Sequence, residues 1–376
     1  MPPDPLSYSN NVCLFFPQSN FQVFLSSCFR TSRRAGHLCF KGHTMNTISS
    51  NVSSTRCLMN NSMESFTYFY YLIFLIGIIG SCVALWAFSK QRKAKKCLNI
   101  YLINLLTADF LLTLALPFKI VVSLGIAPWS VKIFHCQVTA CLMYINMYAS
   151  IIFLGFVSID RYVQLSGSSR FQRIQEPGFA KMMSAIVWVM VLSLMIPNMA
   201  IPIKTIAPKP LLKCAEIKGP LGLRWHVFSN FISIAIFMNV SAVLLTSNFL
   251  LVKKLHRNKD RETRNDVRRA LRHILILTGI YIVCFVPYHI IRIPYTLSQY
   301  KPKADCSVQQ ALYLAKESTF LLAVLNLCFD PILYFYLCQS FRSKITETFL
   351  STNEARGKKD TEAEKEDAET NLTPCS

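Results

Sequence analysis

Residues 66–88 read FTYFYYLIFLIGIIGSCVALWAF and carry no charged side chain. A helix that crosses the hydrocarbon core of a bilayer needs about 20 consecutive, mainly apolar residues. Seven stretches of the chain meet that requirement: 66–88, 98–118, 133–158, 182–203, 227–252, 274–291 and 311–337. Unbroken apolar runs of this length exclude the alternating pattern of membrane β-barrel strands. The sequence therefore predicts an all-α membrane protein, with a seven-transmembrane helix bundle over residues 66–337.

The composition of the whole chain agrees with this fold class. Its 376 residues are 52% hydrophobic and 16% charged, whereas a soluble chain carries about 25% charged residues. The net charge of +20 would suit nucleic-acid binding, but the basic residues concentrate in the loops between the apolar stretches. We therefore expect the lipid bilayer as a partner and no nucleic acid.

The distribution of basic residues in the short loops predicts the orientation, because short loops rich in lysine and arginine stay in the cytosol. The loops at 89–97 and 253–273 are strongly basic and are expected in the cytosol. Seven spans then place the N-terminal tail, residues 1–65, outside the cell in a multi-pass protein of the plasma membrane. Asn51 and Asn60 lie in glycosylation sequons on that outer side.

The segments that flank the bundle give further expectations. We hypothesise that Met45 is the effective start, so that residues 1–44 are absent from the mature protein. Three apolar residues recur at four-residue spacing after the last span: Phe341, Ile345 and Phe349. This stripe predicts a short amphipathic eighth helix on the membrane surface at 338–350. Residues 351–376 are polar and predict a disordered cytosolic tail.

Two aspartates lie within the apolar spans, where a charged group is costly and usually functional. Asp109 and Asp330 have Asn146, Ser150 and Asn326 as candidate partners on neighbouring helices. Five oxygens could hold a sodium ion. A hydrogen-bonded polar cluster that fixes helix packing explains the same residues equally well.

A second polar motif, Asp160-Arg161-Tyr162, ends the third span on the cytosolic side. Arginine beside aspartate can form a local ion pair that a partner protein would break, which makes these residues candidates for coupling to such a partner. The alternative is a juxtamembrane arginine that simply extends to the headgroups.

The outer half of the bundle is rich in cations, which would attract an anionic ligand. Arg292 and Lys316 lie at the outer ends of the sixth and seventh spans, and Lys218 lies in the second outer loop. His289 precedes Arg292 by three residues and is expected on the same helical face, while Tyr144 offers an aromatic surface. These cations suit phosphate or carboxylate oxygens, including those of an acidic peptide. Alternatively, Arg292 and Lys316 extend to headgroups or pair with Glu317, and His289 is a packed polar residue.

Several motifs together resemble the rhodopsin-like class A G-protein-coupled receptors. They are Leu105 to Asp109, Cys136 with Asp160-Arg161-Tyr162, Trp188, Cys284-Phe285-Val286-Pro287 and Asp330-Pro331-Ile332-Leu333-Tyr334. The resemblance covers residues 66 to about 349. Phe285 to His289, Arg292 to Tyr295 and Lys316-Glu317-Ser318 are similar to the purinergic branch, the receptors for ADP and UDP-sugars. The chain departs from the class in reading Gly80-Ser81 in helix one, and Val240 and Asn248 in helix five.

This resemblance implies an activity and its residues. It implies a receptor for an extracellular anionic nucleotide-like molecule or peptide that activates a heterotrimeric G protein of the inhibitory class, with arrestin as a further partner. Nucleotide-binding relatives use positions that match Tyr144, Lys218, Asn230, His289, Arg292 and Lys316, and the adjoining motif adds Tyr295. Sequence alone leaves three pairings open among four outer cysteines. The resemblance selects Cys136 with Cys214 and Cys57 with Cys306.

Other functions of seven-helix proteins are less compatible with the sequence. A light receptor needs a lysine deep in the last span, where this chain has Val324. A transporter usually has inverted repeats and broken helices, and neither pattern is found in the sequence of these spans. No metal-protease motif occurs, and both intramembrane aspartates are explained by the polar cluster, so we expect no enzyme and no cofactor apart from the candidate sodium ion. A peptide-activated receptor without a nucleotide response, or less readily a transporter, are the alternatives.

Overall fold

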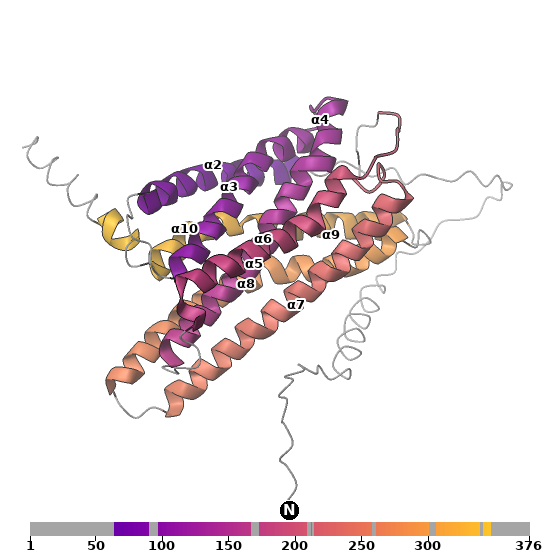
Figure 1. Cartoon of the computed structure of the whole chain (residues 1–376). Coiled ribbons are helices and arrows are strands. Elements are labelled where there is room, and N and C mark those ends of the chain that lie inside the picture. The colour runs from indigo at the N-terminus through magenta and orange to yellow at the C-terminus, as the bar shows by residue number, and fades with distance from the viewer. Residues whose placement is uncertain are drawn as a thin grey trace, which may run out of the picture. The chain divides into compact units, whose positions relative to one another are not determined.

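The computed structural model describes residues 64–89, 97–166, 173–208, 212, 214–257, 261–300, 306–338 and 341–346. The predictions for Met45, Asn51 and Asn60, for the Cys57–Cys306 disulfide and for residues 351–376 lie outside these ranges. Within them the chain forms a bundle of long helices (Figure 1).

Seven helical spans are long and apolar enough to cross a membrane, which confirms the predicted bundle. Five spans are single helices: α2 (Glu64–Ser89), α3 (Cys97–Ser123), α6 (Pro177–Ala200), α7 (Pro220–Arg257) and α8 (Arg261–Tyr300). The third span joins α4 (Trp129–Phe134), the π-helical segment η1 (His135–Thr139) and α5 (Ala140–Ser166). The seventh joins α9 (Cys306–Val324) and α10 (Asn326–Leu337).

The fifth and sixth helices are longer than their apolar stretches predicted. α7 covers Pro220–Arg257 and α8 covers Arg261–Tyr300, so both extend at each end beyond the expected bounds of 227–252 and 274–291. Helical backbone bonding continues where the side chains become polar, so hydropathy marks the part of a helix in lipid and not the whole helix. α7 and α8 extend together past the other helices at the lower left of Figure 1.

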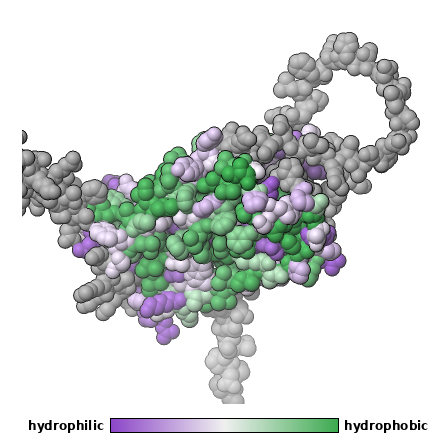
Figure 2. Space-filling view, turned by 90° about the horizontal axis from the view of Figure 1, so that it is seen from above, coloured by the Kyte–Doolittle hydropathy of each residue, from purple (hydrophilic) through white to green (hydrophobic). Residues whose placement is uncertain are grey.

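The bundle has apolar residues outside and polar residues inside. Ile79, Val189 and Phe249 are each about two-thirds exposed, and hydrophobic side chains cover most of the face in Figure 2. In contrast, Asp109 and Asp330 are buried. This distribution suits a lipid solvent, which accommodates apolar groups and leaves polar groups to satisfy one another.

The helix α5 is the centre of the bundle, since it contacts α3, α6, α7, α8 and α9. Its outer turns carry Tyr144, its middle carries Asn146 and Ser150, and its far end carries Arg161. One helix therefore connects three polar regions of the molecule. We call the end near the disulfide of Cys136 the outer end and the end near Arg161 the inner end.

Two glycines bring α2 against α10. A Cβ atom on Gly77 would lie 2.3 Å from the Leu327 side chain, and one on Gly80 would lie 2.5 Å from that of Pro331. No side chain fits at either position without movement of the neighbour. The Gly80-Ser81 departure in helix one thus coincides with a close helix–helix contact.

Residues 341–346 are helical, within the segment predicted as the eighth helix. Phe341 is buried, and its ring packs 5.8 Å from Phe88 and 6.1 Å from Tyr334 between centroids. Ile345 packs at the edge of the same core. Phe349 lies outside the described residues. The first part of the apolar stripe therefore contacts the bundle itself.

Candidate functional site

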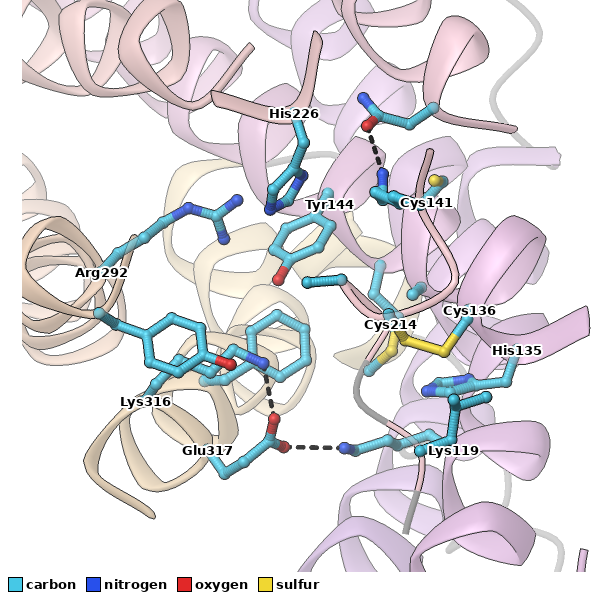
Figure 3. Close-up of a pocket in the computed structure, with 18 of the residues that line it drawn as sticks. Lys119, His135, Cys136, Cys141, Tyr144, Cys214, His226, Arg292, Lys316 and Glu317 are labelled. Carbon is cyan, nitrogen blue, oxygen red and sulfur yellow. Dashed lines mark hydrogen bonds and ion pairs between the residues drawn. A yellow bond between two sulfur atoms is a disulfide. The ribbon is translucent and has the colours of Figure 1, made fainter. Parts of the chain in front are cut away.

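A disulfide closes the outer end of the bundle. Cys136 in η1 is bonded to Cys214 in the second outer loop, with Cα atoms 5.0 Å apart (Figure 3). The same loop pairs back on itself through an antiparallel bridge between Ile203 and Lys218. The bond and the bridge hold Lys218 over the mouth of the bundle.

Beneath this loop lies a cavity of about 160 Å³, the outer cavity. Its lining comes from the second outer loop and from every span except the first. Six of the seven predicted ligand-binding residues line it: Tyr144, Lys218, Asn230, Arg292, Tyr295 and Lys316. Residues from five separate parts of the chain thus meet in one place.

The guanidinium of Arg292 is the main buried cation of the outer cavity. Arg292 is 5% exposed, and its Cζ lies 4.6 Å from the Tyr144 ring centroid and 5.2 Å from that of Tyr288. It donates a hydrogen bond to the amide oxygen of Asn230, and its Nε has no partner. Among the described residues no carboxylate pairs with it. A buried charge without a counter-ion is costly, so this group is suited to an incoming anion.

Lys316 lies in a chain of charges across the cavity floor. Its Nζ is 2.6 Å from Glu317 Oε1, and Lys119 Nζ is 2.8 Å from Glu317 Oε2 (Figure 3). Two ammonium groups therefore share one carboxylate, and the group keeps one net positive charge. The pairing of Lys316 with Glu317, which the sequence offered as an alternative, is present. Lys119 of α3 is an additional partner of Glu317.

Lys218 reaches the cavity from the loop. Its ammonium donates a 2.7 Å hydrogen bond to Asn198 Oδ1, and burial lowers its pKa, as does the nearby charge of Arg292. The positive charge of Lys218 is therefore easier to remove than that of a surface lysine.

His289 is the predicted binding residue that lies outside the cavity lining. Its ring stacks on Phe237 with centroids 4.0 Å apart, and its Nδ1 lies 2.8 Å from the Phe285 carbonyl oxygen. The residue is buried in the core. The predicted shared face with Arg292 gives the direction of the side chain, but His289 sits about one turn deeper.

His226 was missed by the sequence reasoning and lines the cavity. Figure 3 shows it facing Arg292 and Tyr144. It lies four residues before Asn230 on α7, a spacing that places both on one helical face. The four-residue spacing from Asn230 was the signal in the sequence that could have identified His226.

The two intramembrane aspartates meet in the core. Asp109 accepts hydrogen bonds from Asn146 (3.1 Å) and Tyr334 (2.8 Å), and Asn326 donates one to Asp330 (2.6 Å). Three buried oxygens of this cluster have no partner: Ser150 Oγ, Asn326 Oδ1 and Asp330 Oδ1. Two carboxylates at close range repel unless a proton or cation lies between them. The cluster therefore needs a shared proton or a cation, and the described residues hold no group of three or more His, Cys, Asp or Glu that could bind a metal ion.

The inner end is organised around Arg161. Its guanidinium donates to the Leu337 carbonyl oxygen (3.1 Å) and to Gln164 Oε1 (3.0 Å). Gln164 in turn donates to Asp160 Oδ2 (2.9 Å). Asp160 and Arg161 are therefore linked through Gln164 instead of by the direct ion pair that the sequence predicted. Tyr162 packs beside the apolar cluster that contains Leu251.

Comparisons with known proteins agree with this geometry. The family described as "7 transmembrane receptor (rhodopsin family)" matches residues 80–334. The chain is 62% identical over 308 residues to "G-protein coupled receptor 171" of Bos taurus, covering 82% of this chain and 97% of the relative. The Homo sapiens protein of that name is 61% identical with the same coverage. "P2Y purinoceptor 14" of Bos taurus is 38% identical, with 73% of this chain and 82% of the relative covered.

Proposed function

The chain belongs to the rhodopsin family of seven-transmembrane receptors, and on this premise we propose that its outer cavity binds an extracellular anionic ligand and its inner end activates a G protein of the inhibitory class. The family and the relatives are receptors, so the protein is a multi-pass plasma-membrane receptor rather than an enzyme. The proposal also places the N-terminus outside the cell, as the basic loops indicate.

The environment of Arg292 is the observation from which we infer an anionic ligand. Its charge is buried, and none of the described carboxylates pairs with it, while two tyrosine rings flank its guanidinium. A ligand phosphate or carboxylate would supply the missing counter-charge and accept fork-shaped hydrogen bonds. Lys316 and Lys218, at other sides of the same cavity, supply further positive charge.

Two kinds of molecule fit these groups. A nucleotide would place a phosphate on Arg292 and its base against an aromatic ring such as Tyr144, and the name of the purinoceptor relative favours this kind. An acidic peptide would use a carboxylate at the same cation. The names of the Bos taurus and Homo sapiens relatives that are 62% and 61% identical state no ligand.

The signal would travel along α8, because this one helix carries Arg292 at the outer end and Arg272 at the inner end. Pro287 lies between them within the helix, where it removes a backbone hydrogen bond and favours bending. A ligand that binds better to one arrangement of α8 shifts the population toward it. The core aspartate cluster, which we propose to hold a sodium ion, would add its own preference for one arrangement.

The test is agonist-stimulated guanine-nucleotide exchange on a purified inhibitory G protein, with nucleotides, sugar nucleotides and acidic peptides as ligands. Arg292→Ala should abolish the response to the active ligand, whereas Lys204→Ala, which removes an exposed lysine of the second outer loop, should leave it intact. Surface amounts of both variants are measured in parallel. A full response from Arg292→Ala would refute the proposed anion site.

A further inference from the structure

A second cavity opens at the inner end of the bundle, and we call it the inner cavity. It has a volume of about 740 Å³. Five of its lining residues are basic: Arg161, Arg269, Arg272, His273 and Arg342. The described residues contribute no acid to its lining.

The basic side chains of the inner cavity are largely free to meet an occupant. Arg269 and Arg272 are exposed, and the Nε of Arg161 is buried without a partner. Like charges at close range raise the energy of an empty cavity, and an anionic occupant would lower it. The site therefore fits a segment of chain with several negative charges.

The chain itself contains such a segment. Residues 360–369 read DTEAEKEDAE, with a single basic residue, Lys365. The described helix ends at 346, and its Arg342 already lines the inner cavity. The fourteen residues from 346 to 360 would cover about 20 Å as a flexible chain and up to about 45 Å when extended. The acidic segment is therefore within reach of the cavity.

We propose that residues 360–369 dock in the inner cavity and compete there with the G protein. A segment joined by a short flexible linker has an effective concentration on the order of 1 mM. If the free peptide binds with a dissociation constant of about 0.1 mM, the tethered segment occupies about nine cavities in ten. Its removal would then raise the basal exchange rate about tenfold.

Binding is tested first without a G protein, so that this result is independent of the proposed coupling. The receptor is the full chain with every acid in 360–369 replaced by its amide, which leaves the inner cavity free. A fluorescein-labelled peptide of residues 360–373 should bind it, and the peptide with the same amide replacements should not. Arg272→Gln should weaken peptide binding at least threefold, whereas Arg268→Gln, an exposed position on α8 outside the lining, should not.

The unmodified full chain should bind the free peptide about tenfold more weakly than the amide-tail variant, because its own tail competes. Its basal exchange rate should be correspondingly lower, an outcome that also rests on the proposed function. Equal binding of the acidic and amide peptides would overturn the proposal. It would also be overturned if vesicles containing phosphatidylinositol bisphosphate bound the amide-tail receptor through Arg272 while the acidic peptide did not, because the cavity would then be a lipid site.

Discussion

Replacement of Glu317 by glutamine should increase the affinity of the outer cavity for anions. Glu317 Oε1 is 2.6 Å from Lys316 Nζ, and a ligand oxygen on the opposite side of that ammonium, at about 2.8 Å, would lie about 5 Å from the carboxylate. At an effective dielectric constant of about 20, the repulsion between the two anions is about 3 kcal/mol. Its removal corresponds to about 100-fold in affinity. Partial exposure of Lys316 and Lys119, 16% and 12%, reduces this figure, so an increase of about tenfold or more is expected.

The same change should make the receptor less stable. Glu317→Gln leaves two ammonium groups without their shared carboxylate, and loss of one partner from a buried ion pair costs about 3–5 kcal/mol. The exposure of both lysines places the expected cost at or below the lower value. Affinity and stability should therefore change in opposite directions.

The assay is thermal unfolding of purified receptor in detergent over a series of inorganic pyrophosphate concentrations. The variant should unfold at a lower temperature without pyrophosphate and should reach half-maximal stabilisation at a concentration about tenfold lower than the wild type. Glu176→Gln, which removes an exposed acid that makes no side-chain capping hydrogen bond at the start of α6, is the control and should shift neither value appreciably. If folded Glu317→Gln bound pyrophosphate no better than the wild type, the reasoning about the shared carboxylate would be refuted.

Three further predictions follow from the described contacts. Gly80→Ala places a methyl group 2.5 Å from a side chain of α10 and should cost about 1–3 kcal/mol in stability. Gly279→Ala, with open space around it, should not lower the unfolding temperature. Equal unfolding temperatures for the two variants would contradict this prediction. Asn248 donates a 2.8 Å hydrogen bond to Thr278 between α7 and α8, so Asn248→Ala should raise basal exchange up to about fivefold, the equivalent of about 1 kcal/mol; an unchanged or reduced rate would contradict it. Because burial lowers the pKa of Lys218, its charge is present at low pH and lost as pH rises through that value; agonist affinity should fall accordingly, and Lys218→Arg, which stays charged, should remove that loss.

The sequence predicted the bundle well because the lipid solvent imposes a simple rule. Apolar runs of about 20 residues must be spanning helices, and cations near their outer ends have few alternatives to a cavity or the headgroups. Arg292 and Lys316 could therefore be expected at an outer cavity before any contact was known. Helix ends could not be, since polar side chains do not interrupt a helix such as α8.

The ion pair between Lys119 and Glu317 across the bundle was not predictable. Lys119 and Glu317 lie 198 positions apart, and their contact depends on the rotation of α3 relative to α9. The depth of His289 was also beyond the sequence, because helical spacing gives the direction of a side chain and not its distance from the cavity. The core contact of Phe341 was not predicted, for a related reason. An apolar stripe at four-residue spacing describes a face for lipid and a face for protein equally well.

The central claim is that the buried charge of Arg292 recognises the negative charge of a ligand. The most direct measurement is equilibrium binding of the active ligand and of an uncharged analogue, its phosphate or carboxylate masked as a neutral ester, to the wild type and to Arg292→Gln. Close charge pairs at interfaces show coupling energies of about 1.5–7 kcal/mol, so the wild type should prefer the charged ligand by at least about tenfold and the variant should lose that preference. If both receptors discriminated equally between the two ligands, Arg292 would not be the anion-binding residue.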